Sequence, residues 1–368
     1  PGNPEAILQA IREYAAENPD KPFYMGGNWN VGGMFENDSP DKKVLDAIVP
    51  DIPVFLLSQS GHSAWVNSKA LEVAGIDEEF QNTGAYIFDR YPGSNEPSGT
   101  VRESAMVLIT SALGYMPADE FARFLPAEIE RYSRFGVTAI QSAEGSRTWL
   151  EAAAAVEREG NLNVRLFPAL DWLTSQLRAL NDEETQQFID DWKSYQTEQI
   201  RPHYVKIFAD GAADSHTLLM KEPYTNKPDS KGSMYLPLKD YRRAILDYYS
   251  RGITVHVHSM GDATTANIVE IFEEAEKQFP ESKASLHLAH CTLIDTVEFD
   301  RLKRLERVTL NFSPMLAVPH PQMKLFFTDP IGAERHKQLF PVPRALELGL
   351  TVGFGSDFPS SLVPAVSY

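Results

Sequence analysis

The chain has 368 residues, of which 43% are hydrophobic, so it can bury a large core as one α/β domain or as two ordinary ones. It carries 34 Lys and Arg against 51 Asp and Glu, a net charge of −17, which argues against nucleic acid and membrane partners. No apolar stretch approaches the roughly 20 residues of a membrane-spanning helix. The single cysteine, Cys291, excludes an internal disulfide, which fits a reducing compartment and also a cysteine-poor secreted enzyme. Because no spanning segment is present, we expect a soluble protein, and a cytoplasmic rather than a secreted one.

Residues 1–116 are expected to form a loop-rich insertion or cap. A helix is predicted at the start, because Ile7, Ile11 and Tyr14 recur on one face of PEAILQAIREYAAENP. Short apolar segments follow at FYMGGNWN and VFLLSQSGHSAW, and the remainder is rich in Gly, Pro, Asn and Ser. The composition changes at Pro117, where we place the domain boundary.

Residues 117–368 alternate between strand-like and helix-like segments. The strand candidates are GVTAIQSA, VRLFPAL, YVKIFADG, ITVHVHSMGD, LHLAHC, VTLNFSPM and TVGFGSDFP. Seven β/α units predict a TIM-type (β/α)₈ barrel whose first strand and flanking β-sandwich are missing from this chain. A doubly wound open sheet is the alternative, but no Gly-rich dinucleotide fingerprint follows any strand.

Ionisable residues stand in or at the ends of four of these strands, where the active sites of barrels form. Lys206 lies inside an apolar strand, and a buried lysine is costly unless it is neutralised or paired. His256 and His258 share one face of the next strand, His290 ends the strand after that, and Asp357 follows a Gly-rich strand end. Singly, each has an ordinary structural explanation. Together they predict a metal site, since imidazole and carboxylate suit zinc, iron, nickel or manganese.

The ordered motifs VKIFADG, HVHSMGD, LAHC and GSDFP resemble the amidohydrolase superfamily, in particular its amidohydrolase-3 branch, which includes N-substituted formamide deformylases. GHSAWVNSKALEVAGI, PSGTVRESA, KEPY and GDATTANIVEIFEEA support the resemblance, which covers nearly the whole chain. The resemblance implies that Lys206 is carboxylated and bridges two metal ions, and that His258 and His290 bind the second metal. It implies that Asp357 binds the first metal and serves as proton shuttle.

The implied reaction is hydrolysis of an amide or formamide C–N bond by metal-activated water, with Asp357 and Lys206 as catalytic residues. One or two divalent ions are implied, zinc being the expected metal. His258 is preferred to His256 because it directly precedes the Gly-Asp segment in the family pattern, and His256 is the fallback. His287 must face the opposite way from His290 and is expected to pack between barrel and helix.

Further residues are candidates for contact with a small-molecule substrate at the barrel mouth. Each has a structural alternative, because a loop histidine is often solvated and an aromatic residue often belongs to the core. The substrate-binding candidates are His62, Trp29, Asp210 and His216, and the aromatic residues that could line an apolar pocket also include Trp65, Phe208 and Phe358.

The chain departs from the family pattern at both ends. No His-x-His pair of a first strand precedes the loop-rich region, and the sequence stops at SSLVPAVSY soon after the eighth-strand motif. We expect a fragment rather than a natural truncation, because an unclosed barrel exposes two sheet edges. We therefore expect the metal of this chain to be absent or under-coordinated.

Two functional alternatives remain beside the hydrolase. A catalytically decayed barrel acting as a binding or regulatory protein is supported only by the missing His-x-His pair. A phosphate-ester or sugar-processing barrel would require a basic phosphate pocket that the sequence does not indicate. A homodimer is an expectation from fold analogy.

Overall fold

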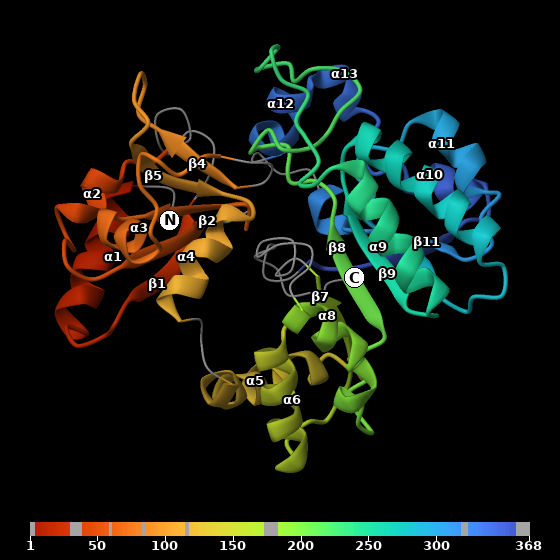
Figure 1. The fold of residues 1–368 in the computed structure, drawn as a ribbon, viewed down its shortest axis with the longest axis horizontal. Helices are drawn as coiled ribbons and strands as arrows, with labels where there is room; N and C mark the ends of the chain where they lie inside the picture. The colour runs from red at the N-terminus through yellow and green to blue at the C-terminus, as the bar shows by residue number, and fades with distance from the viewer. Residues whose placement is uncertain are drawn as a thin grey trace.

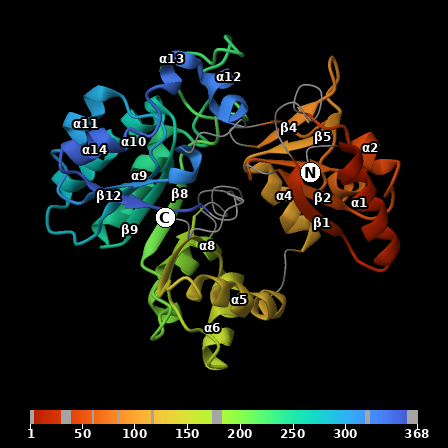
Figure 2. The ribbon, with the colours of Figure 1, turned by 180° about the vertical axis from the view of Figure 1, so that it is seen from behind.

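A computed structural model describes residues 4–29, 39–58, 61–82, 86–114, 118–172, 183–317 and 323–357. Within them the strands form a five-stranded mixed sheet and a seven-stranded parallel sheet. The two sheets belong to separate parts of the ribbon, the first in red to orange and the second in yellow-green to blue (Figure 1). The view from behind shows the same separation (Figure 2).

The N-terminal unit is built on the mixed sheet, whose strand order is β1-β2-β3-β5-β4. Only β1 and β2 run parallel; the remaining neighbours are antiparallel. Its elements are α1 (Pro4–Glu17), β1 (Tyr24–Trp29), α2 (Lys42–Asp46), β2 (Val54–Ser58), β3 (Ser63–Val66), α3 (Ser68–Val73), β4 (Ile87–Arg90), β5 (Pro97–Arg102) and α4 (Ala105–Leu113).

Both faces of this sheet are buried, as the alternation along β2 shows. Val54 and Leu56 pack in one apolar cluster with residues of α1 and α2, whereas Phe55 packs in another with residues of α3 and α4. Gly27 of β1 fits only without a side chain, because a Cβ there would lie 2.6 Å from the carbonyl oxygen of Leu57. The region is thus more regular than its Gly- and Pro-rich composition indicates, since several of those residues lie within strands, among them Gly26, Gly27 and Gly99.

The second unit is the parallel sheet with its helices. Its strand order is β12-β11-β10-β9-β8-β7-β6, so each strand pairs with the next along the chain. The elements are α5 (Ala118–Ser133), β6 (Ala139–Gly145), α6 (Arg147–Arg158), β7 (Arg165–Asp171), α8 (Glu183–Asp190), η2 (Trp192–Tyr195), β8 (Tyr204–Phe208), α9 (Leu238–Ser250), β9 (Thr254–Ser259), α10 (Asp262–Gln278), β10 (Leu286–His290), α11 (Thr296–Leu302), β11 (Val308–Phe312), η3 (Pro314–Ala317), η4 (Lys324–Thr328), α12 (Asp329–Ile331), α13 (Ala333–His336), α14 (Val342–Glu347) and β12 (Thr351–Phe354).

All seven predicted strands are present, and all pair in parallel. In the described residues β6 and β12 do not pair with each other, so the sheet is an open, curled half-barrel. One apolar cluster runs from Ile129 of α5 to Ala345 of α14 and fills the space between the sheet and its helices. None of the helices in these ranges combines the length and apolar composition needed to cross a bilayer.

Candidate functional site

Strand register brings the predicted residues of β8 and β9 onto one face. Lys206 lies opposite His256, and Phe208 lies opposite His258. Neighbouring strand residues in register point to the same side of a sheet. The intervening Val257 belongs to the apolar cluster beneath the helices, so these polar side chains occupy the other, inner face of the half-barrel.

Lys206 is nearly fully buried on this inner face. Its Nζ lies 4.2 Å from the centroid of the Phe208 ring, a cation–π contact. Its charge contributes to lowering the pKa of both His258 and His290, which places it within electrostatic range of both rings.

His258 is fixed from one side only. Its Nδ1 lies 3.0 Å from Oδ1 of Asp210, while its Nε2 is buried without a hydrogen-bond partner. Burial, together with the neighbouring His290, holds the pKa of His258 well below its usual value. The ring is therefore neutral near pH 7, the form in which imidazole binds metals.

Asp210 lies behind His258 and has no exposed surface. Its carboxylate also accepts hydrogen bonds from the backbone N–H groups of Met260 and Gly261, at 3.1 and 2.8 Å, and from Oγ1 of Thr264 at 2.7 Å. Burial raises the pKa of Asp210 to about 7 even though these hydrogen bonds act to lower it. This position does not support the predicted contact between Asp210 and substrate; it supports orientation of His258.

His290 joins the site because the backbone leaves the strand conformation at the end of β10. His290 and Cys291 have φ values of 71° and 48°, in the left-handed region that is costly for residues other than glycine. The His290 and His258 ring centroids are 4.5 Å apart. Nδ1 of His290 lies 3.0 Å from Oγ of Ser313 and 4.0 Å from Oδ2 of Asp357. Burial lowers the pKa of His290 to about 4, so this ring is neutral as well.

The prediction that His287 packs between barrel and helix was wrong. His287 lies opposite His256 in the strand register, and its ring is 5.7 Å from the rings of both His256 and Tyr204. Leu286 and Leu288, on either side of it, occupy the helix-facing cluster. Strand alternation therefore places His287 on the inner face, next to the fallback ligand.

The residues fit part of a metal site. The buried, unpartnered Nε2 of His258, the adjacent neutral His290 and the nearby Asp357 carboxylate have the right chemistry for zinc. Across the ranges that the structure describes, no group of three or more His, Cys, Asp or Glu side chains has the geometry to hold a metal ion. Two of the four predicted ligands thus converge, and Lys206 and Asp357 lie near them.

The N-terminal unit supplies another imidazole, that of His62. Its ring centroid is 5.6 Å from that of His258, and its Nδ1 lies 2.8 Å from Oε2 of Glu103. Burial acts to lower the pKa of His62, but the Glu103 carboxylate raises it to about 9. A cation is thereby held next to two neutral imidazoles.

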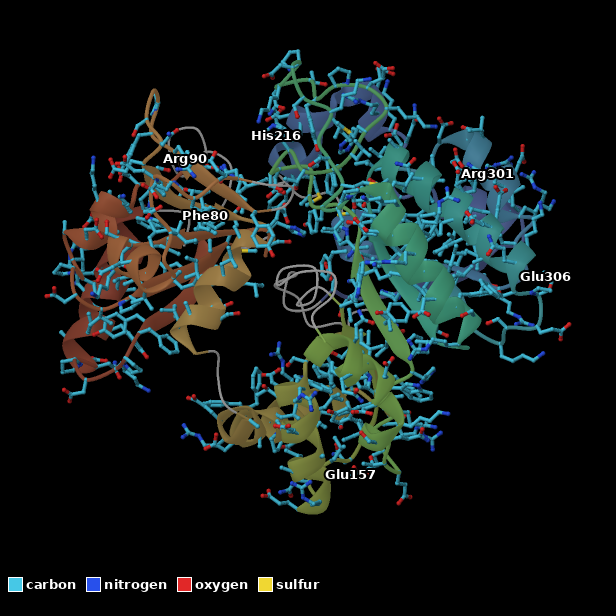
Figure 3. The ribbon with its side chains drawn as sticks, in the orientation of Figure 1. Phe80, Arg90, Glu157, His216, Arg301 and Glu306 are labelled. Carbon is cyan, nitrogen blue, oxygen red and sulfur yellow. The ribbon has the colours of Figure 1, made fainter. Side chains whose placement is uncertain are left out.

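Two other predicted residues have contacts elsewhere. Nε2 of His216 lies 2.9 Å from Oδ1 of Asn226, and its ring packs on Tyr224, so it contacts its own connection between β8 and α9. Figure 3 shows His216 on that connection, close to α12. Trp29 is 1% exposed and donates through its indole to the carbonyl of Leu56 at 2.7 Å. Substrate contact by either residue stays a prediction, and Phe358 lies outside the described residues.

Sequence reasoning missed two of the residues that hold the histidines. Ser313 binds His290, and Glu103 binds His62. Glu103 lies within PSGTVRESA, which carried the family resemblance, but nothing in that motif indicates a buried carboxylate.

Comparison with known proteins agrees with this fold. The chain belongs to the amidohydrolase family, whose model matches residues 1–367. YtcJ of Bacillus subtilis (strain 168) is 27% identical over 361 residues, which cover 96% of this chain and 64% of YtcJ. An N-substituted formamide deformylase of Arthrobacter pascens is 23% identical over 367 residues, which cover 96% of this chain and 65% of the deformylase. The chain thus spans just under two thirds of the length of these relatives.

Solved structures share the fold. An uncharacterized metal-dependent hydrolase from Pyrococcus furiosus aligns with a TM-score of 0.65 at 22% identity, covering 99% of this chain and 69% of the hydrolase. One from Pyrococcus horikoshii OT3 aligns with a TM-score of 0.67 at 20% identity, covering 98% of this chain and 66% of the hydrolase.

Proposed function

We propose that the protein is a metal-dependent hydrolase that cleaves the C–N bond of a small amide or formamide. The observation that carries this proposal is the pair of adjacent, buried, neutral imidazoles, His258 and His290, in which Asp210 holds Nδ1 of His258 and the opposite Nε2 has no hydrogen-bond partner. The name of the deformylase relative supports the formamide class.

Each residue has a proposed role. His258 and His290 hold a divalent ion, zinc being the expected one, and Lys206 supplies a further ligand oxygen after carboxylation. The ion, when bound, supplies Lewis acidity and makes water more acidic at neutral pH. Carboxylation would also replace a buried ammonium, which is costly to desolvate, by a group that binds metal.

Asp357 is the proposed proton shuttle. Its carboxylate is 4.0 Å from Nδ1 of His290 and its side chain is 35% exposed, so it lies beside the histidine pair and is also open to solvent. From there it can take a proton from the attacking water and deliver it to the leaving nitrogen.

A catalytically decayed barrel that binds a ligand without turning it over is the second candidate. It is favoured by the lack of a complete metal-ligand set in the described residues.

The decisive experiment loads the protein with zinc in bicarbonate buffer, measures bound metal, and screens N-formyl and N-acyl amines for amine release. We expect bound zinc and hydrolysis of at least one compound, with both lost in His258→Asn. His336→Asn is the matched control, because His336 lies on α13 and contacts Thr328. Absence of both metal and turnover in the wild type would support the decayed barrel.

A further inference from the structure

Glu103 joins the N-terminal unit to the half-barrel through a buried carboxylate. Its side chain is 1% exposed. Oε1 accepts hydrogen bonds from Oγ of Ser215 at 3.0 Å and Oγ1 of Thr217 at 2.5 Å, and Oε2 accepts one from the hydroxyl of Tyr235. All three donors come from the connection between β8 and α9, which begins at the active-site end of β8.

The same carboxylate fixes the His62 ring. Nδ1 of His62 lies 2.8 Å from Oε2, and the Glu103 N–H donates to the His62 carbonyl at 3.1 Å, so the two residues are tied by both side chain and backbone. Hydrogen bonds and the adjacent His62 hold the pKa of Glu103 below its usual value despite burial. An ionised carboxylate only accepts, so Nδ1 must carry the hydrogen and Nε2 is the atom on the far side of the ring.

Backbone conformation and close packing both restrain Glu103. Its φ of 52° is left-handed, a conformation that residues other than glycine adopt only where the surroundings impose it. On the barrel side, a Cβ at Gly211 would lie 2.4 Å from Oε1 of Glu103 and 2.1 Å from Oγ1 of Thr217. Gly211 directly follows Asp210, so one residue of this segment supplies the carboxylate that holds His258 and the next packs against the carboxylate that holds His62.

We propose that Glu103 is a positioning residue that holds the His62 ring against the metal-binding histidines, so that the N-terminal sheet supplies a fixed imidazole nitrogen, Nε2, for a hydrogen bond with the substrate. This inference rests on the proposed hydrolase function. His62 is well placed for it, because its ring lies 5.6 Å from that of His258 while its side chain keeps 17% exposure.

The test compares wild type with Glu103→Gln and His62→Gln. Zinc affinity by calorimetry should be unchanged in both, because neither residue is a proposed ligand. On the best substrate of the amide screen, each variant should lower kcat/KM by about 10- to 100-fold. The double variant should be no worse than the single ones, because both act through one ring. Glu96→Gln is the matched control, since Glu96 lies in the connection between β4 and β5 and pairs with Lys42 of α2.

A spectroscopic measurement separates this inference from the proposed function. Imidazole ¹⁵N NMR should show His62 with hydrogen on Nδ1 in the wild type and a mixture of ring states in Glu103→Gln. If Glu103→Gln does not fold, Tyr235→Phe replaces it in this measurement. This variant keeps the Glu103 carboxylate and should change the His62 signals in the same direction but by less. A wild type that neither binds zinc nor turns over substrate contradicts the proposed function and the substrate contact, while the NMR result still decides the positioning role. Unchanged His62 signals, or Glu103→Gln with lower stability but full kcat/KM, would overturn the inference.

Discussion

Asp210 and His258 form a buried carboxylate–imidazole pair, with Oδ1 3.0 Å from Nδ1 and the opposite Nε2 left without a partner. In metal sites such a second hydrogen bond fixes the tautomer and orientation of the ligating histidine. The lone pair of Nε2 is therefore ready for a cation.

Asp210→Asn should weaken zinc binding by about 10- to 100-fold, because the amide no longer fixes the tautomer of His258. Calorimetric titration with zinc measures the effect. The matched control is Asp300→Asn, at an exposed position of α11. An unchanged dissociation constant would show that Asp210 has no part in orienting the ligand.

Lys206→Met should reduce the metal content while raising the free energy of unfolding of the metal-free protein by about 1 kcal/mol or more, since it removes a buried charge. Metal analysis and urea unfolding in chelator give the two quantities. Lys239→Met, at an exposed position of α9, should change neither. A less stable metal-free variant would mean that the Lys206 ammonium itself stabilises the fold.

Gly211→Ala should destabilise the protein by about 1–3 kcal/mol, because the added Cβ overlaps Thr217 and Glu103. Urea unfolding measures the loss. Gly353→Ala is the control, since a Cβ there would meet only a Thr309 methyl group at 3.8 Å. Equal stability of the two variants would contradict the close packing around Glu103.

The pKa of His62 predicts a pH dependence of stability. Because its folded-state pKa of about 9 exceeds the ordinary 6.5, its contribution is complete below pH 6.5 and is lost as the pH rises through 9. The loss should amount to about 3 kcal/mol at most. Unfolding free energies of metal-free wild type and His62→Asn, measured from pH 6 to 10, should converge as the pH rises. Parallel curves would contradict a raised pKa.

The strands of the half-barrel could be predicted from sequence because each is a short apolar run between helical segments, a local pattern. The mixed sheet could not, because its strands are short and include Gly26 and Gly27, which locally indicate a turn. In the mixed sheet, burial of both faces of β2 decides the structure, rather than the intrinsic strand preference of its residues.

The sequence likewise predicts one part of the candidate site and not the other. Strand alternation predicts that His256 and His258 share a face, and the structure confirms it. Placing His287 opposite to His290 gave the wrong surroundings for His287, because the left-handed backbone at His290 interrupts the alternation at the end of β10. Glu103 reaches its donors across more than 100 residues, a separation at which no local pattern carries information.

The residues other than glycine that have a left-handed backbone conformation also affect which substitutions the protein tolerates. His290, Cys291, Asp357, Glu103 and His216 account for nearly all of those in the described chain. In a deep mutational scan, glycine or asparagine at His290, Asp357 and His216 should relax the backbone and increase the amount of folded protein, while removing the side chains proposed or predicted to act there. At Glu103 the loss of its buried hydrogen bonds opposes this gain. Selection for expression would then enrich glycine or asparagine at those three codons, whereas selection for turnover would retain the residues present now.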